Sequence, residues 1–335
     1  MRNTWHHAVA ASRVVDGAYW AAMPTAAEPA ARIDRTMTPD VLPTLHAAVL
    51  TWYGTHARPL PWRVPDCSPW GVLVSEVMLQ QTPVARVAGP WQEWLTRWPT
   101  PAALAQSTPA DVLAAWGRLG YPRRALRLRE AAHVIVRDHG GVVPANVDGL
   151  LALPGVGAYT ASAVAAFAYH QRTVVLDTNC RRVLARLIGG EVFPPPSLTA
   201  LERRRAEAAL PADAATSVTW NVAVMELGAL VCTASSPRCT ECPVSGACAW
   251  LAAGRPGDAH AGRRRTQPWT GTDRQARGVI MAALREAPVP GASLADLWPD
   301  PVQRQRAVNS LVADGLAERV GNPGRDVLRL PTGAP

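Results

Sequence analysis

Four of the chain's six cysteines lie in one short segment, residues 232–248, which reads CTASSPRCTECPVSGAC. Their spacing is C-x6-C-x2-C-x5-C. Four thiolates this close in sequence can bind one metal centre, because the turns between them bring the sulfurs to a common point. A loop closed in this way must fold around its metal, which constrains it more than any other segment. The four residues are Cys232, Cys239, Cys242 and Cys248.

The spacing also bears on the kind of metal centre. A structural zinc site usually has two CxxC pairs separated by a longer spacer, whereas only Cys239 and Cys242 form such a pair here. This asymmetry suits a [4Fe–4S] cluster at least as well as zinc. A pair of disulfides fits a short secreted chain better than one of 335 residues. We therefore expect a [4Fe–4S] cluster, with zinc as the alternative.

Charge and composition indicate a partner and exclude one type of reaction. The net charge is +8 and the pI about 9.7, which favours a polyanion such as nucleic acid, although a solvated basic surface gives the same values. All 34 basic residues are arginine. Because the chain contains no lysine, it has no side-chain amine for a Schiff base, and catalysis through a lysine imine is excluded.

The chain divides into four segments. Residues 1–39 are rich in alanine and are predicted to be a disordered tail, with no convincing signal peptide. Residues 40–252 follow a helical period and are predicted to be an all-α domain, without the run of about 18 apolar residues that a membrane span needs. Residues 253–272 form a predicted linker. Residues 273–335 are predicted to be a small winged-helix-like module, the alternative being a helical cap with a frayed tail.

The helical period predicts each helix of these two parts. In the main domain we expect helices over roughly 41–53, 70–81, 84–98, 109–116, 123–138, 158–169, 178–188, 198–210, 213–231 and 243–251. In the C-terminal module we expect helices over 275–287, 293–298 and 301–315, followed by two short strands around a turn at 321–324.

Residues 150–160, LLALPGVGAYT, join two of the predicted helices. Pro154 ends the first, and Gly155 and Gly157 permit a tight turn before the second. Backbone N–H groups at such a helix start can bind a phosphate without reading the base sequence. A lone G-x-G is typical of an ordinary helix link, but LPGVG followed by YTASAVAAF is the helix-hairpin-helix signature of DNA-binding proteins.

Acidic residues in apolar surroundings are the candidate catalytic groups. Glu76 lies in WGVLVSEVMLQQT, where burial would raise its pKa and make it a general acid near neutral pH. A helix acid at a solvent margin is the alternative. Asp177 ends an apolar run where a helix begins, a position at which aspartate also serves as an N-cap. Asn179 and Arg181 follow and could donate to a substrate. Glu226 is interpreted as a structural acid bonded near the cysteine loop.

The LPGVG hairpin, Asp177 beyond it and the cysteine loop together resemble the endonuclease III superfamily of DNA glycosylases. The helix SEVMLQQT, the preceding PWR and the later WGRLGYPRRA resemble more specifically its adenine DNA glycosylase branch. The resemblance covers roughly residues 41–251. It implies the all-α helix-hairpin-helix glycosylase fold, with the four cysteines as ligands of a [4Fe–4S] cluster.

The resemblance also implies roles for individual residues. Glu76 matches the catalytic acid and Asp177 the second catalytic carboxylate, with Asn179 as its polar partner. Tyr159 occupies the position at which bifunctional relatives have a catalytic lysine, so a monofunctional enzyme is implied. Two residues match those that wedge into the base stack around a mispair, and further residues are implied to contact DNA. The wedges are Gln81 and Tyr121; the further contacts are Gln80, Leu153, Gly155, Val156, Gly157, Arg181 and Arg238.

The implied reaction is hydrolysis of the N-glycosidic bond of adenine mispaired with 8-oxoguanine or guanine in double-stranded DNA. The adenine must leave the stack to be reached. Glu76 would protonate adenine N7, and Asp177 would stabilise the oxocarbenium-like sugar. We expect a monomer in the cytoplasm, associated with the nucleoid and not with a membrane.

Two other hypotheses stay open. A glycosylase of the same fold that removes thymine or uracil opposite guanine is the nearest, although a pyrimidine offers no N7 for Glu76 to protonate. The second is a non-catalytic iron–sulfur DNA-binding protein. Members of the adenine branch usually carry a C-terminal Nudix-like domain that inspects 8-oxoguanine. Residues 273–335 leave no room for it, so strict preference for that lesion does not follow.

Overall fold

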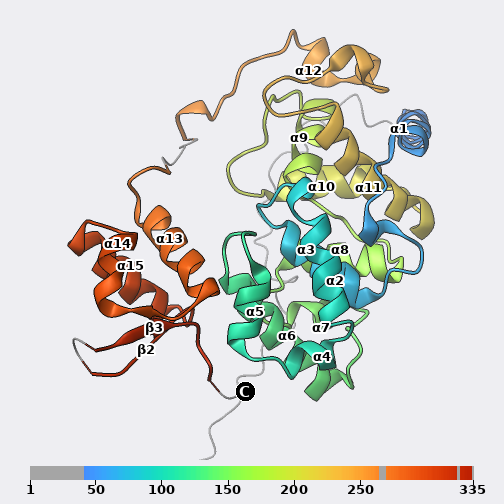
Figure 1. The fold of residues 1–335 in the computed structure, drawn as a ribbon. Coiled ribbons are helices and arrows are strands. Elements are labelled where there is room, and N and C mark those ends of the chain that lie inside the picture. The colour runs from blue at the N-terminus through green and yellow to red at the C-terminus, as the bar shows by residue number, and fades with distance from the viewer. Residues whose placement is uncertain (1–40, 264–268, 323–324, 334–335) are drawn as a thin grey trace, which may run out of the picture. The chain divides into compact units, whose positions relative to one another are not determined.

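The structure is a computed structural model that describes residues 41–263, 269–322 and 325–333. The predicted tail over residues 1–39 lies outside them. Residues 41–252 contain helices, turns and loops but no strand, which confirms the all-α prediction (Figure 1). No described helix is long and apolar enough to cross a membrane.

The main domain is built from twelve described helices and a few 3-10 turns. The helices are α1 (Leu42–His56), α2 (Pro69–Leu79), α3 (Ala88–Arg97), α4 (Pro101–Ala105), α5 (Pro109–Trp116), α6 (Arg123–His139), α7 (Val147–Leu151), α8 (Ala158–Tyr169), α9 (Thr178–Leu187), α10 (Ala200–Ala209), α11 (Ala214–Leu230) and α12 (Ala249–Ala252). Most predicted helices are confirmed, with ends that differ by a few residues.

The exceptions have local reasons. The helix predicted over 84–98 begins with a separate 3-10 turn, Val84–Arg86, before α3. The helix predicted over 243–251 is wrong: a 3-10 turn at Ser245–Ala247 and the four-residue α12 stand there, because the cysteine loop takes up that part of the chain. Helix α7 is the short helix expected before Pro154, whereas α4 was not predicted, since five residues are too few to show a helical period.

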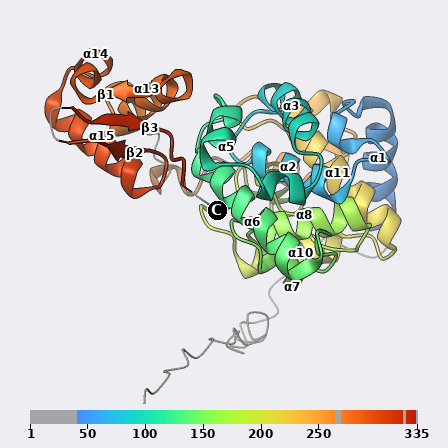
Figure 2. The ribbon, with the colours of Figure 1, turned by 60° about the horizontal axis from the view of Figure 1, so that its bottom comes forward.

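Two hydrophobic clusters give the domain its shape. The first packs α2 through α8 around fully buried side chains such as Leu73, Trp94 and Trp116. The second packs α1 against α9, α10 and α11, and several cysteines of the loop pack against it. In both ribbon views α1 and α11 lie at one end of the domain, and α5 and α6 at the other (Figures 1 and 2). Helices α2 and α8 belong to the first cluster and α9 to the second.

The two helices that carry the predicted acids start at clear capping signals. At α2, Ser68 accepts a hydrogen bond from the Gly71 N–H, and Pro69 fills the first helical position, where its missing N–H costs nothing. At α9, Asp177 is the N-cap and accepts from the Cys180 N–H at 2.6 Å. Residues 70–78 of α2 are all buried, so a solvent margin for Glu76 is excluded.

The C-terminal module contains α13 (Asp273–Glu286), α14 (Leu294–Leu297) and α15 (Pro301–Ala313), together with three short strands. The strands β1 (Val289–Pro290), β2 (Glu318–Val320) and β3 (Val327–Arg329) form an antiparallel sheet in the order β1-β3-β2. The predicted helices and the β2–β3 ribbon are therefore confirmed, and β1 is an addition. The winged-helix class of this module and the four-segment division stay predictions.

Candidate active site and iron–sulfur loop

Glu76 lies in the middle of the buried helix α2 and is 5% exposed. Its carboxyl forms a hydrogen bond with the Tyr159 hydroxyl, whereas Oε2 has no hydrogen-bond partner among the described residues. Burial raises the pKa of Glu76 to about 7, a shift that the Tyr159 hydrogen bond opposes and the charge of Asp177 increases. The side chain therefore holds an exchangeable proton near neutral pH and has one buried oxygen that no described residue pairs.

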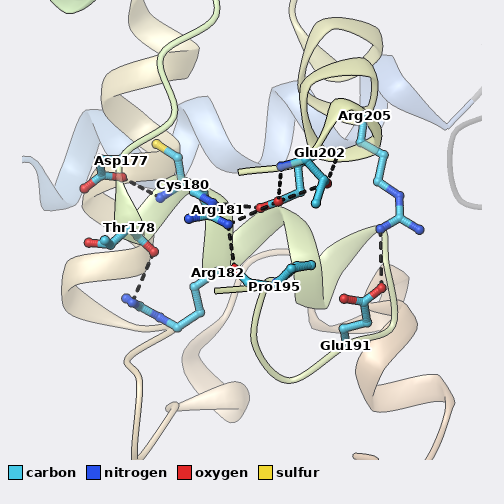
Figure 3. Close-up of polar contacts among 10 residues, drawn as sticks. Asp177, Thr178, Cys180, Arg181, Arg182, Glu191, Pro195, Glu202 and Arg205 are labelled. Atoms are coloured by element: carbon cyan, nitrogen blue, oxygen red, sulfur yellow. Dashed lines mark hydrogen bonds and ion pairs between the residues drawn. The ribbon is translucent and has the colours of Figure 1, made fainter. Parts of the chain in front are cut away.

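Asp177 brings a second carboxylate to Glu76 from the other hydrophobic cluster. Its Oδ1 caps α9 through the Cys180 N–H (Figure 3). Its Oδ2 accepts from Asn179 Nδ2 at 2.8 Å. These bonds fix the carboxylate, because a capping group cannot rotate without leaving a helix amide unpaired. The N-cap role and the functional role are thus compatible, and Asn179 is a partner of Asp177 as predicted.

Tyr159 links the two acids. It lies in the first turn of α8, directly after the hairpin. Burial raises the pKa of its hydroxyl well above the usual value, and the charges of Glu76 and Asp177 raise it further. Tyr159 is therefore a neutral hydrogen-bond donor to Glu76.

Glu226 on α11 corrects one prediction. It is fully buried, but its partners are Arg58 and Arg63, not groups of the cysteine loop. Arg58 donates through Nε to Oε1 at 2.6 Å and through Nη2 to Oε2 at 2.9 Å, and Arg63 Nη2 donates to Oε2 at 2.9 Å. Although burial acts in the opposite sense, the hydrogen bonds with Arg58 hold the pKa of Glu226 below its usual range.

This triad also borders the acid site. Arg63 is close enough to lower the pKa of Glu76, and Arg63 Nη1 is a buried donor with no partner among the described residues. Sequence reasoning missed the roles of Arg58 and Arg63. A signal existed, because a glutamate within an apolar helix requires a cationic partner unless it stays protonated.

Arg181 has partners that the sequence did not predict. Its Nε donates to Glu202 Oε1 at 2.7 Å and its Nη2 to the Pro195 carbonyl at 2.7 Å (Figure 3). Glu202 also closes a capping box with Thr199 at the start of α10. The guanidinium is largely buried, and Nε and Nη2 are engaged in these contacts. Its contact with a substrate or DNA stays a prediction.

The predicted hairpin is present, but its residues divide into two kinds. Leu153 and Val156 bury their side chains in the first cluster, and the Val156 N–H donates to the Leu153 carbonyl at 3.1 Å. A contact of these two residues with DNA would therefore come from the backbone, and it stays a prediction. Gly155 has φ +78° and lies so close to Arg127 that a Cβ would approach its side chain to 2.7 Å. Gly157 caps α8 without a side-chain hydrogen bond, which leaves the first amides of α8 for an anion.

The predicted wedge residues share an unusual backbone. Gln81 has φ 54° and Tyr121 has φ 46°, both left-handed, and both side chains are exposed. The preceding Gln80 caps the end of α2 and donates from Nε2 to Thr160 Oγ1 at 3.2 Å. Gln80 is thus engaged with α8, whereas Gln81 and Tyr121 project into solvent.

The cysteine loop fits a four-iron cluster. All four thiols are free, and the charges of Cys232, Cys248 and Cys239 add to burial in raising the pKa of Cys242 to about 11. Among the described residues, no three His, Cys, Asp or Glu side chains lie close enough together to bind a single metal ion. A four-iron cluster takes one thiolate on each iron and so accepts more widely spaced sulfurs than zinc does.

Two buried arginines connect this loop to α9. Arg186 donates from Nη1 to Cys232 Sγ at 3.3 Å, and Arg182 donates from Nε to the Cys232 carbonyl at 2.8 Å. Arg182 also donates to Asn179 Oδ1 at 2.8 Å, so a chain of hydrogen bonds runs from the loop to Asp177. Arg238 is half-exposed within the loop, where it pairs with Glu241 at 3.1 Å. This exposure is compatible with its predicted DNA contact.

Two family models match the chain. Residues 74–206 match the HhH-GPD superfamily of base excision DNA repair proteins. Residues 232–248 match the iron-sulfur binding domain of endonuclease III. The helical fold and the site described above therefore define a helix-hairpin-helix base excision repair glycosylase with a [4Fe–4S] cluster, as predicted.

Similar proteins narrow the assignment. The adenine DNA glycosylase of Mycolicibacterium smegmatis is 52% identical over 277 residues, which are 82% of this chain and 92% of the relative. The chain belongs to the adenine DNA glycosylase family. Among solved structures, a thermostable thymine-DNA glycosylase is similar with a TM-score of 0.58 and 26% identity, covering 63% of this chain and 97% of that one. A trapped endonuclease III–DNA covalent intermediate shares the fold, with a TM-score of 0.56 and 20% identity over 65% of this chain and 99% of that one.

Proposed function

We propose that this protein is a monofunctional DNA glycosylase that hydrolyses the N-glycosidic bond of adenine mispaired with 8-oxoguanine or guanine. The observation that carries the proposal is Glu76, a buried acid that has a pKa of about 7 and an unpartnered Oε2, beside Asp177. The identity to an adenine DNA glycosylase over most of the chain supports the choice of base.

Glu76 supplies the proton that makes adenine a leaving group. An adenine anion departs poorly, whereas adenine protonated at N7 departs as a neutral molecule. An acid with a pKa close to the working pH combines a protonated population with a sufficient tendency to donate. After donation, the ionised Glu76 can take a proton from the attacking water, and the Tyr159 hydroxyl stabilises that anion by its hydrogen bond.

Asp177 acts on the sugar. As the bond to adenine breaks, the deoxyribose gains oxocarbenium character, and a fixed carboxylate stabilises that positive charge. The Asn179 and Cys180 hydrogen bonds hold Asp177 in place before the charge develops. Such preorganisation reduces the reorganisation that the reaction would otherwise require.

The backbone of the hairpin and the exposed loop residues hold the DNA. The amides that follow Gly157 bind a phosphate, while Gln81 and Tyr121 enter the stack where the adenine has left it. Arg238 contacts the backbone from the iron–sulfur loop. In this role the loop shapes a DNA-binding surface, with Cys232, Cys239, Cys242 and Cys248 as the cluster ligands.

The proposed activity also indicates the oligomeric state and the location of the protein. We infer that the protein works as a monomer on double-stranded DNA in the cytoplasm, at the nucleoid. Thymine or uracil opposite guanine remains the second candidate substrate, because a solved thymine-DNA glycosylase has a similar fold. A pyrimidine has no N7 for Glu76, which favours adenine.

The test is a panel of duplexes incubated with the purified protein and then treated with alkali. The panel carries adenine opposite 8-oxoguanine, guanine and cytosine, and thymine or uracil opposite guanine. We expect alkali-dependent scission at adenine opposite 8-oxoguanine or guanine, and no covalent trapping by borohydride. Scission at thymine instead of adenine would move the assignment to the pyrimidine enzymes, and trapping would contradict the monofunctional chemistry.

A further inference from the structure

The loops that carry the two wedge residues share an unfavourable backbone. Gln81 follows the end of α2, and Tyr121 lies between α5 and α6, yet both have positive φ. A left-handed conformation costs a non-glycine residue roughly 1–2 kcal/mol. Such residues persist only where the surrounding structure holds them. The question is which group holds two exposed loops at once.

One guanidinium reaches both loops. Arg124, in the first turn of α6, donates from Nη1 to the carbonyls of Val77 at 2.7 Å and Gln80 at 2.5 Å. These carbonyls belong to the end of α2, where a helix has no backbone donors for its last C=O groups. Arg124 therefore closes the end of α2 immediately before Gln81. Helix α6 packs against both α2 and α5, the two helices after which these loops follow (Figure 1).

The other nitrogen of the same guanidinium holds the Tyr121 loop. Arg124 Nη2 donates to the Gly120 carbonyl at 3.1 Å and to Thr82 Oγ1 at 3.2 Å. The Thr82 hydroxyl in turn lies 3.2 Å from the Leu119 carbonyl, to which it donates. The residues on either side of Gln81 and those before Tyr121 are thus joined through one side chain.

The charge of Arg124 is not offset by a carboxylate. No carboxylate of the described residues pairs with it, and its polar partners are backbone carbonyls and one hydroxyl. The guanidinium also lies over the rings of Trp116, at 5.3 Å, and Tyr121, at 5.6 Å. A planar fork can serve both loops in this way, whereas a lysine ammonium cannot match the same geometry.

We propose that Arg124 is a positioning residue that joins the Gln81 and Tyr121 loops into one rigid clamp, and that this clamp opens the base stack around the mispair. The proposal rests on the proposed function. It assigns Arg124 to the step in which adenine leaves the duplex and not to cleavage of the bond. Its loss should therefore matter most where base pairing and stacking must be overcome.

The experiment compares Arg124→Lys and Arg124→Gln with the wild type in single-turnover excision from two duplexes. One has adenine opposite guanine, and the other has adenine opposite an abasic analogue, where no pair must be broken. We expect roughly a 10²-fold loss on the mispair and no more than about a threefold loss opposite the abasic position, since misplacement of a positioning group costs about that much. Arg137→Gln, on the exposed last turn of the same helix, removes an equal charge and is the matched control.

A spectroscopic readout separates positioning from general damage. With 2-aminopurine beside the target adenine, the wild type should give a fluorescence increase on binding that both Arg124 variants lose and Arg137→Gln retains. Equal losses on the two duplexes, or no loss on either, would overturn the proposal. A wild type that excises adenine from neither duplex would overturn the proposed function instead. Arg124→Lys keeps the charge, so it provides the comparison if Arg124→Gln does not fold.

Discussion

Helices α2 and α11 each bury one glutamate, and the two carboxyls have different partners and opposite pKa shifts. Glu76 on α2 has one hydroxyl partner and a pKa raised to about 7. Glu226 on α11 is bonded by two arginines, and its pKa lies below the usual range. Burial alone favours the neutral acid, so the counter-charge decides which form exists at neutral pH. The comparison teaches that an apolar helix around an acid does not by itself identify a catalytic group.

The largest effect is expected from Glu76→Gln. A carboxamide keeps the size of the side chain but cannot donate a proton to N7, so excision of adenine should fall by at least about 10³-fold. Binding to the uncleaved duplex should stay within about threefold, because the side chain lies inside the site and not on the phosphate contacts. Single-turnover rates and a fluorescence titration give the two values.

Stability provides the control for that variant. Because a neutral amide does not carry the cost of ionising a buried acid, the free energy of unfolding of Glu76→Gln in urea at pH 7 should be no lower than that of the wild type. Excision by Glu76→Gln at the wild-type rate would remove the acid from the mechanism.

For Glu226→Gln we expect the opposite pattern, in which the main effect is on stability and not on excision. This change removes the fully buried anion between Arg58 and Arg63 and leaves two partly buried cations unpaired, so the free energy of unfolding should fall by about 3 kcal/mol. Urea denaturation followed by circular dichroism measures it. If Glu226→Gln unfolds at the wild-type urea concentration, the triad is not a structural ion pair.

The smallest effect is expected from Tyr159→Phe, which should shift the pH at which excision declines. In the wild type, excision should decline as the pH rises through about 7, because Glu76 loses its proton there. The Tyr159 hydrogen bond lowers the pKa of Glu76, so removing it should move this decline to higher pH. Rates between pH 5.5 and 9, with burial otherwise preserved by the phenylalanine ring, locate the midpoint. A midpoint that stays in place or moves to lower pH would contradict the hydrogen bond.

The titration of Glu76 also makes the free energy of unfolding depend on pH. Because the pKa of Glu76 is higher in the folded state than the ordinary 4.5, the folded chain binds more protons than the unfolded chain between 4.5 and about 7. Its contribution to the free energy of unfolding therefore falls as the pH rises through that window. Glu76→Gln should lack this part of the pH dependence.

Sequence reasoning was most successful where a local signal was sufficient. The hairpin, the Asp177 cap and the cysteine loop each have residues that carry their structure within a few positions. Sequence reasoning did not identify the partners of side chains that bond to residues distant in the sequence. Arg181, next to Asp177, turns to Glu202 on α10, and Glu226 turns to Arg58, which is 168 residues away.

The amino-acid sequence by itself determined the helical class, the metal loop, the hairpin and the absence of a lysine nucleophile, because periodicity, spacing and composition are properties of the chain alone. Only the tertiary structure decided which carboxyl is protonated, which arginines are engaged and how two left-handed loops are held together. Those outcomes depend on burial and on opposite charges from different helices, and neither exists until the two hydrophobic clusters come together.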